Sequence, residues 1–352
     1  MTSSVHDEPR GRGSDFAALT REIRGAGLLD RRHGYYLTRI LINLTVFAVG
    51  CVAFVVIGDS WWQLFMAAFF AVMFTQLSFI GHDAGHKQIF RGRRANDVVG
   101  FLHGGLVGLS YDWWVGKHSR HHANPNHEDD DPDLDLPVLA FTRDQGRRRT
   151  GFPRWMAKHQ AYLFFPLLLA EGLNLHWSGF RHVWRADGER RALEAVLLVT
   201  HVTVYLGAVF VVLSPLTGIV FVLVHQGLWG FYMGCSFAPN HKGMPTLSEG
   251  HLLDFLRKQV LTSRNVRGGR WVDIVLGGLN YQIEHHLFPS MPRPNLRHAQ
   301  ALVEAFCDGH RIAYAQCGLL RSYRYVLRHL HEVGAPLRHP VGDLVRAQEP
   351  VG

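Results

Sequence analysis

Four long runs of apolar residues, almost free of charge, divide the chain. They cover residues 36–57, 61–79, 192–213 and 219–237. Each is close to the roughly 20 residues that a helix needs to cross the hydrocarbon core of a bilayer. Two short polar breaks, one at residues 58–60 and one at 214–218, divide the runs into pairs. The pattern predicts an all-α integral membrane protein with four transmembrane helices in two hairpins.

Basic residues flank the outer ends of these hairpins, whereas the short breaks contain neither Lys nor Arg. Six arginines precede the first hairpin, Lys87 and three arginines follow it, and Arg185, Arg190 and Arg191 precede the second. Positive flanks face the cytoplasm, so we expect a multi-pass protein of the cell membrane with both termini cytoplasmic. This topology accounts for the net charge of +8. Because the chain carries no nucleic-acid motif, we expect no nucleic-acid partner.

The remaining segments predict a polar cytosolic arm at 1–33, a membrane domain at 34–335 and a polar tail at 336–352. Composition predicts disorder in the arm through Ser14 and a short interfacial helix from Asp15 to Leu29. Two further helical patterns lie at 296–307 and 314–331. The four cysteines form no C-x-x-C pair, which argues against a disulfide framework and against a zinc ribbon.

Histidines gather in three clusters beside the predicted spans. His82 and His86 follow the second span, and His285 and His286 stand near the end of the domain. In the middle cluster His118, His121 and His122 have the spacing i, i+3, i+4, which places three imidazoles on one face of a helix. His241, just beyond the fourth span, is an eighth candidate ligand.

Eight imidazoles exceed the needs of one tetrahedral zinc ion, so the clusters predict two metal ions in a cytoplasmic, histidine-rich helical cap. Imidazole binds iron, copper, zinc and nickel, and the ligand type does not choose among them. The clusters contain neither Cys nor Met, which disfavours a cuprous site.

Two shorter apolar segments lie between the histidine clusters. If the clusters form one site, neither segment can cross the membrane alone, because a single crossing would place clusters on opposite sides. Residues 101–115 are glycine-rich and short, and they predict a re-entrant or interfacial segment. Residues 161–177 are apolar but interrupted by Glu171, Asn174 and His176. A single crossing there would separate the second and third clusters, so we expect an amphipathic helix in the membrane interface.

The motifs H-x-x-x-H at 82–86, H-x-x-H-H at 118–122 and Q-x-x-H-H at 282–286, in this order, resemble those of the membrane fatty acid desaturases. The resemblance covers residues 35–330 and extends to the two-hairpin topology. It implies two iron ions held by the seven cluster histidines, with His241 as a further ligand. Gln282, which front-end, linoleoyl-type members share, then ligates iron directly or through water. Asn240 and His127 are expected behind the ligands, or in ordinary structural hydrogen bonds.

The same resemblance implies an O2-dependent enzyme that inserts a cis double bond into an acyl chain carried by CoA, a carrier protein or a membrane lipid. Front-end members of the family commonly carry a fused cytochrome b5 domain, which the motif H-P-G-G marks. This chain has only His339-Pro340-Val341-Gly342 in its place. We therefore expect a separate electron donor such as a ferredoxin or a cytochrome. An apolar tunnel would hold the acyl chain. Five aromatic residues are candidates for its walls or for an interface belt, namely Trp113, Trp114, Trp229, Phe231 and Tyr232.

Three alternatives remain open at this stage. A lipid hydroxylase or epoxidase on the same scaffold would carry the same histidine clusters. A metal-dependent membrane hydrolase would be expected to show H-E-x-x-H, which the His127-Glu128 and His331-Glu332 pairs do not complete. A metal carrier would place ligands inside the spans, where His201 and His225 lie.

Overall fold

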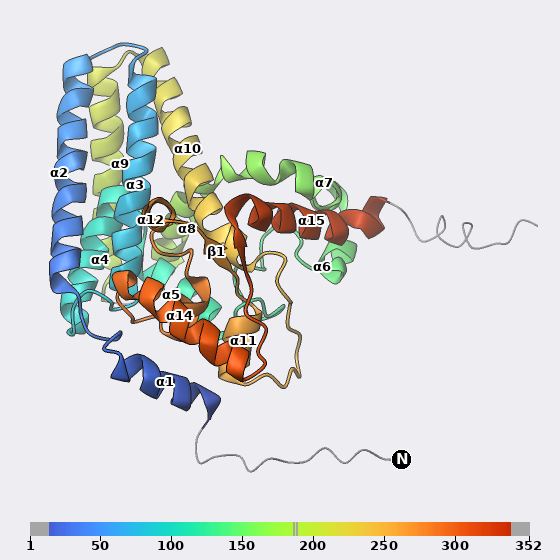
Figure 1. Ribbon diagram of the computed structural model, residues 1–352. Coiled ribbons are helices and arrows are strands. Elements are labelled where there is room, and N and C mark those ends of the chain that lie inside the picture. Colours follow the sequence, from blue (N-terminus) through green and yellow to red (C-terminus); the bar gives the residue numbers. More distant parts are fainter. Residues whose placement is uncertain (1–13, 186, 188, 339–352) are drawn as a thin grey trace, which may run out of the picture.

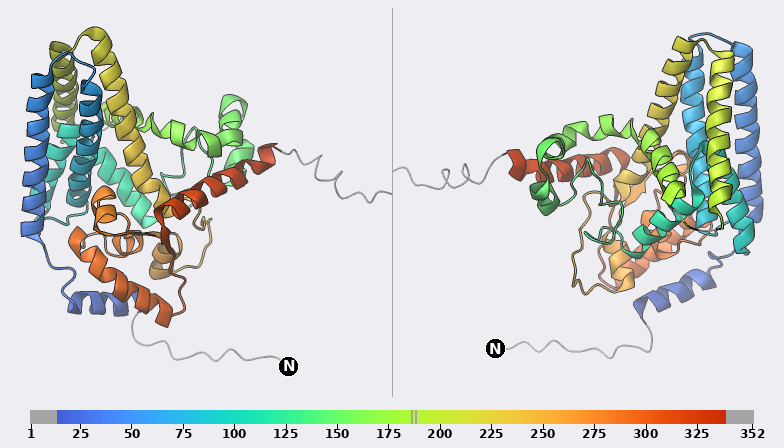
Figure 2. Two further views of the ribbon diagram at one scale, coloured as in Figure 1. Left: turned by 45° about the horizontal axis from the view of Figure 1, so that its top comes forward. Right: turned by 180° about the vertical axis from the view of Figure 1, so that it is seen from behind.

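Four long helices form two hairpins that stand side by side in the computed structural model, which describes residues 14–185, 187 and 189–338 (Figure 1). They are α2 (His33–Ile57), α3 (Gln63–Gly85), α9 (Arg191–Val212) and α10 (Pro215–His241). Within the described residues these four helices are long and apolar enough to cross a membrane. The predicted all-α membrane architecture is therefore confirmed, and two further views show the same hairpins from other sides (Figure 2).

Two of these helices continue past the apolar runs that predicted them. Helix α3 ends at Gly85 instead of near residue 79, and α10 ends at His241 instead of near residue 237. At 27 residues, α10 is about 40 Å long, which exceeds the roughly 30 Å of a hydrocarbon core. His82 and His241 lie on these extra turns, beyond the apolar runs. Because both residues are still helical, the helix backbone fixes their positions.

The segment expected at 101–115 is divided between two helices, α4 (Arg93–Val107) and α5 (Tyr111–Ala123). Gly108 ends α4 with a left-handed φ of 72°. A Cβ there would lie 2.5 Å from the His201 ring and 2.6 Å from the His176 ring. Ser110 then begins α5 by accepting a hydrogen bond from the Trp113 amide. The break turns the chain so that α5 carries the second histidine cluster.

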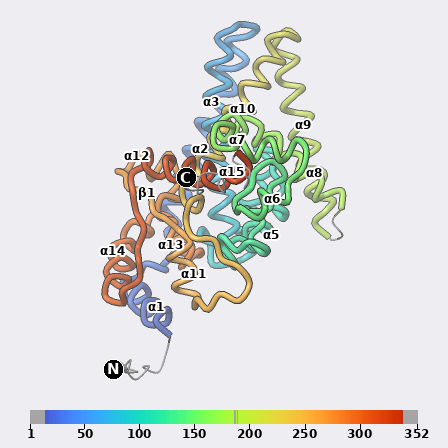
Figure 3. The backbone as a smooth tube through the Cα atoms, turned by 90° about the vertical axis from the view of Figure 1, so that its right-hand side faces the viewer, coloured from blue at the N-terminus to red at the C-terminus, as the bar shows by residue number. Residues whose placement is uncertain are grey.

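The segment expected as one helix at 161–177 also consists of two, α7 (Gly151–Leu168) and α8 (Glu171–Arg185). Neither is among the candidate spans. Helix α7 packs along α15 (Leu319–Arg338), and the short α6 (Arg143–Arg148) contacts both of them. In a view turned by 90°, α7 and α15 again lie together (Figure 3).

A second layer, made of three short helices and one longer helix, covers the open ends of the hairpins. It contains α11 (Phe255–Leu261), α12 (Arg270–Val275), α13 (Gln282–Leu287) and α14 (Arg293–Gly309). Two parallel strands, β1 (Asn265–Arg267) and β2 (Gln316–Gly318), pair Val266 with Cys317. The helix predicted at 314–331 therefore begins five residues later, at the start of α15. Three of the five preceding residues form β2 and pair with β1 instead.

Helix α1 (Asp15–Gly25) packs on this cap, where an interfacial helix was expected. Its Leu19 and Ile23 are fully buried in one apolar cluster with Leu256 and Val303. The apolar face of α1 is thus covered by protein instead of lipid. The predicted disordered start, the tail from residue 339 and the His339-Pro340-Val341-Gly342 segment lie outside the described residues, and the domain boundaries stay predictions.

Candidate metal centre

The three histidine clusters, far apart in the sequence, meet beneath the hairpins. His86 lies at their meeting point. Its ring centroid is 4.7 Å from that of His82, 4.8 Å from His118, 4.6 Å from His122 and 4.7 Å from His285. The chain turn after α3, helix α5 and helix α13 each contribute to this packing. The tertiary structure therefore brings the three clusters into one site.

The imidazoles divide into two groups, each able to hold a metal ion. His82, His86, His118 and His285 form the first group, and His121, His241 and His286 form the second. Within each group one ligand nitrogen per residue lies within 4.8 Å of all the others. We call them the first and second histidine groups.

His122 and Gln282 complete the surroundings of the two groups. The ring of His122 stacks on His286 at 4.1 Å, and its Nε2 lies 3.1 Å from Nε2 of His118 in the first group. His122 therefore stands between the groups. Nε2 of Gln282 lies 2.9 Å from Nε2 of His241, beside the second group.

Hydrogen bonds behind the second group fix which ring nitrogen faces the centre. Nδ1 of His121 lies 3.0 Å from both carboxylate oxygens of Asp131. Nδ1 of His241 lies 3.0 Å from the Thr262 carbonyl, and Nδ1 of His286 lies 2.9 Å from Oε1 of Gln259. Because each partner is an acceptor, each Nδ1 carries the proton and each Nε2 keeps its lone pair. The second group is thus prepared to bind a metal through Nε2.

A buried ion pair supports the first group in a similar way. Oδ1 of Asp83 lies 3.3 Å from Nδ1 of His82, and Oδ2 of Asp83 lies 2.6 Å from Arg293 on α14. Arg293 also donates to the Phe79 carbonyl at 2.8 Å. The cap is therefore joined to the end of α3 at the residue next to a ligand.

The sequence did not identify Asp83, Asp131, Gln259, Thr262 or Arg293 as parts of the site. Asp131 belongs to an acidic turn at 128–133, whose run of acids was the only signal. Of the two residues predicted behind the ligands, Asn240 donates to Oε1 of Gln282 at 3.1 Å. His127 instead lies beside Asp130 and His251. Its carbonyl accepts from the Asp131 amide at 3.0 Å, so it supports the turn through its backbone.

The donor atoms fit a metal because several are otherwise without a partner. Nε2 of His82, His86, His285 and His286 is buried and makes no hydrogen bond with the described residues. An unpaired polar atom in the interior costs free energy, and metal coordination would satisfy all four. Burial and the neighbouring imidazoles also hold the pKa of His118, His122, His285 and His286 well below the usual range. These side chains therefore favour the neutral form, which is the form of imidazole that binds a metal.

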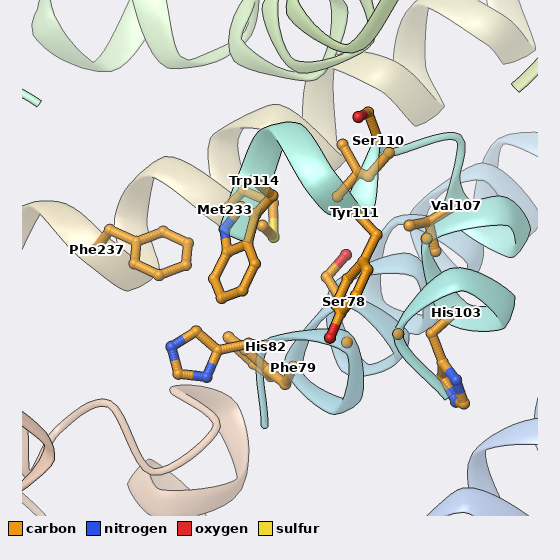
Figure 4. Close-up of a pocket in the computed structure, with 14 residues that line it drawn as sticks. Ser78, Phe79, His82, His103, Val107, Ser110, Tyr111, Trp114, Met233 and Phe237 are labelled. Atoms are coloured by element: carbon orange, nitrogen blue, oxygen red, sulfur yellow. The ribbon is translucent and has the colours of Figure 1, made fainter. Parts of the chain in front are cut away.

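A narrow apolar cavity begins at the first group (Figure 4). Trp114, Phe237 and His82 lie on one side of it, with Tyr111 and Ser78 opposite. Its volume is about 30 Å³, which is smaller than the ~300 Å³ or more of typical ligand pockets. Side chains must therefore move before a long chain can enter.

Of the five aromatic residues considered for the tunnel wall or for an interface belt, only Trp114 lines this cavity. Trp229 is fully buried in the core beside Phe74, and Tyr232 donates to the Val275 carbonyl at 2.7 Å. The rest of the wall comes from α3, α4, α10 and the start of α5, and it includes His82 and His103 beside small and apolar residues.

The fold and the site define an integral membrane protein with a histidine-rich centre able to bind metal, adjoining an apolar cavity. Residues 59–318 match the family model described as fatty acid desaturase. The chain belongs to this family.

Named relatives agree with that assignment. An acyl-lipid (9-3)-desaturase of Physcomitrium patens is 32% identical over 85% of this chain, and a Delta(8)-fatty-acid desaturase of Euglena gracilis is 29% identical over 85%. A Delta 8-(E)-sphingolipid desaturase of Kluyveromyces lactis is 29% identical over 91%. The matched regions cover 58%, 74% and 59% of these relatives, so the chain spans less than two thirds of two of them.

Replacing Asp131 by asparagine tests the support behind His121. The amide keeps an acceptor oxygen but loses the charge that favours the proton on Nδ1 of His121. Loss of such an outer contact typically weakens metal binding about 10–100-fold. Metal retained against a series of chelators measures the change. Asp129→Asn, an exposed neighbour in the same turn, is the control, and equal metal retention in the two variants would contradict the assignment.

Proposed function

We propose that the protein is an O2-dependent fatty acyl desaturase that inserts a cis double bond into an acyl chain at a centre of two iron ions. The observation that carries this proposal is the pair of histidine groups, seven imidazoles with His122 between them, beside an apolar cavity. The family match supports the same reading. An all-imidazole donor set also accepts other metals, so the choice of iron rests on the family.

The two groups divide the ligands between the ions. His82, His86, His118 and His285 would hold one iron, and His121, His241 and His286 would hold the other. His122 can serve either, and Gln282 adds an amide beside the second ion, directly or through water. Bound iron supplies the activation of O2 that removal of hydrogen from an unactivated C–H bond requires, which no protein side chain provides.

The protein's own residues bind and orient the alkyl chain. Trp114, Phe237 and Met233 give the cavity apolar walls that exclude water and hold methylene groups beside His82. Met233 is unbranched and adapts its shape readily, so its movement is one way for the cavity to widen. Correct placement of two adjacent methylenes against the centre decides which bond is oxidised.

We further propose that the cap faces the cytoplasm of a cell membrane. The positive flanks of both hairpins support this orientation. Each turnover needs two electrons, which a redox protein such as a ferredoxin or a cytochrome would deliver at the cap. The acyl chain arrives on CoA, on a carrier protein or as part of a membrane lipid.

Lipid analysis of a host that makes this protein together with an electron donor tests the proposal. The expected result is an unsaturated species that is absent with His121→Ala, with its double bond located by mass spectrometry. A hydroxylated or epoxidised product would favour the alternative oxidation on the same scaffold. If the purified protein contains about two irons per chain but, with a competent donor, oxidises no acyl chain carried by CoA, by a carrier protein or by a membrane lipid, the proposed function is wrong.

A further inference from the structure

We propose that α7 and α8 form a partly immersed platform in the cytoplasmic leaflet, and that one continuous aromatic stripe on these helices contacts lipid. The stripe consists of large apolar side chains that are about half exposed or more, namely Trp155, Tyr162, Leu169, Leu173, Trp177 and Trp184. This inference concerns the bilayer and does not depend on the proposed reaction.

The spacing of the stripe shows that it is one face of the helix pair. Successive members are separated by four or by seven residues, that is by one or two helical turns, which keeps side chains on one side of a helix. The register survives the junction between the helices, where Leu169 keeps a helical φ of −64°. Trp184 is 82% exposed, Tyr162 is 71% exposed and Trp177 is 67% exposed. Such a contiguous apolar surface marks an interaction site.

The opposite faces of both helices are already occupied by protein. Ala157 and Phe164 of α7 are buried in apolar clusters that include Val333 and Leu330 of α15. Gly172 and Gly179 of α8 are buried. The stripe is therefore the free side of a helix pair that is anchored behind. In Figures 1 and 3, α7 lies on the side of α15 toward which the spans extend.

The anchor point places the stripe at membrane depth. Gly230 and Gly234 of α10 form a G-x-x-x-G pattern, which lets helices approach closely in membranes. A Cβ on Gly230 would lie 2.3 Å from the Gly172 amide nitrogen, and one on Gly234 would lie 2.5 Å from a Leu168 methyl group. Counted from Pro215, the roughly 20 residues that cross the hydrocarbon core end near Gly234. The junction of α7 and α8 therefore sits at the inner boundary of the core.

The backbone at this junction suits a low-water environment. The Leu169 amide donates to Pro166, the Ala170 amide to Leu167 and the Asn174 amide to Ala170. Non-helical backbone at membrane depth requires such internal partners. The Leu169, Ala170 and Asn174 amides therefore keep internal acceptors at the junction.

Aromatic and basic side chains alternate as they do at a membrane interface. Trp and Tyr favour the headgroup level, and Arg181 lies on the stripe between Trp177 and Trp184. Arg154 and Arg185 are exposed beside it. These guanidinium groups can reach lipid phosphates while the rings lie at the level of the headgroups. This mixture favours a bilayer over a second copy of the chain, which would bury the arginines.

Tryptophan quenching by brominated lipids tests the platform. The full chain is reconstituted in phosphatidylcholine vesicles with bromine near the headgroup or near the chain ends. We expect the variant with Trp155→Phe, Trp177→Phe and Trp184→Phe to show a smaller quenched fraction than the unaltered protein. The shallow bromine should account for most of the difference. Trp229→Phe, which removes a fully buried ring, is the control and should leave the quenched emission unchanged.

Equal quenching of the triple variant and the unaltered protein would overturn the proposal. The proposal would also be wrong if a second copy of the chain covered the stripe. In that case quenching would not differ between the two proteins, and Tyr162→Cys would cross-link one chain to another. Circular dichroism and the thermal midpoint establish that the triple variant is folded. Because quenching is measured without turnover, its result is independent of the proposed desaturase activity.

Discussion

Replacing His285 by alanine is expected to remove metal from the first histidine group and to reduce lipid oxidation to background. His285 is buried, and its ring lies 4.7 Å from His86 and 4.9 Å from His82. It is the only member of its group that comes from α13 in the cap. Loss of the His285 imidazole should weaken metal binding by more than the roughly 100-fold that follows from losing a hydrogen-bond partner behind a ligand. Metal per chain and product formation measure the result.

Two further variants separate ligation from general damage. His285→Gln keeps most of the side-chain volume, so a loss of metal there reflects the missing imidazole instead of a cavity. His298→Ala removes an exposed histidine from α14 and should leave both metal content and product unchanged. Full metal content with normal product formation in His285→Ala would show that His285 is not a ligand.

Replacing Arg293 by methionine should destabilise the protein by about 3–5 kcal/mol, because it leaves a buried carboxylate without its cation. Asp83 is 2% exposed and Arg293 is 6% exposed at the side chain, and their ion pair measures 2.6 Å. We expect the thermal midpoint to fall by on the order of 10 °C. The same change should loosen His82, since Asp83 also contacts its Nδ1.

The neighbouring arginine on the same helix provides a matched control. Arg297 pairs with Asp273 at 3.5 Å, but its side chain is 43% exposed. Because solvent screens such a pair, Arg297→Met should cost less than about 1 kcal/mol. Adding Asp83→Asn to Arg293→Met should recover part of the lost stability, since it removes the unpaired charge. Equal thermal midpoints for Arg293→Met and Arg297→Met would show that the buried ion pair contributes no more to stability than the exposed one.

The ends of the helices could not be read from the apolar pattern. The runs stop near residues 79 and 237, yet α3 reaches Gly85 and α10 reaches His241. Hydropathy reports where lipid is, whereas a helix continues as long as its backbone hydrogen bonds do. The segments at 101–115 and 161–177 were each expected as one continuous piece, but local turn geometry at Gly108 and after Leu168 divides each of them between two helices.

The residues that hydrogen-bond to the candidate ligand histidines could not be predicted from the sequence either. Asp131 supports His121 from ten positions away, and Thr262 supports His241 from 21 positions away across a loop. Contacts of this kind follow no helical or strand period, because the path of a loop sets them. By contrast, the i, i+3, i+4 spacing predicted that the three candidate ligands on α5 share one helix face, because a helix has a fixed repeat.

The sequence by itself determined the four spans, their pairing in two hairpins and the identity of the eight candidate imidazoles. These are local properties, since apolar length and helical repeat are written in consecutive residues. Only the tertiary structure decided which imidazoles share a group, where His122 stands, and which buried carboxylates orient His82 and His121. It also decided that α1 covers protein and that α7 and α8 turn one aromatic face outward. Those features depend on packing between distant segments, where shape and hydrogen-bond partners replace periodicity.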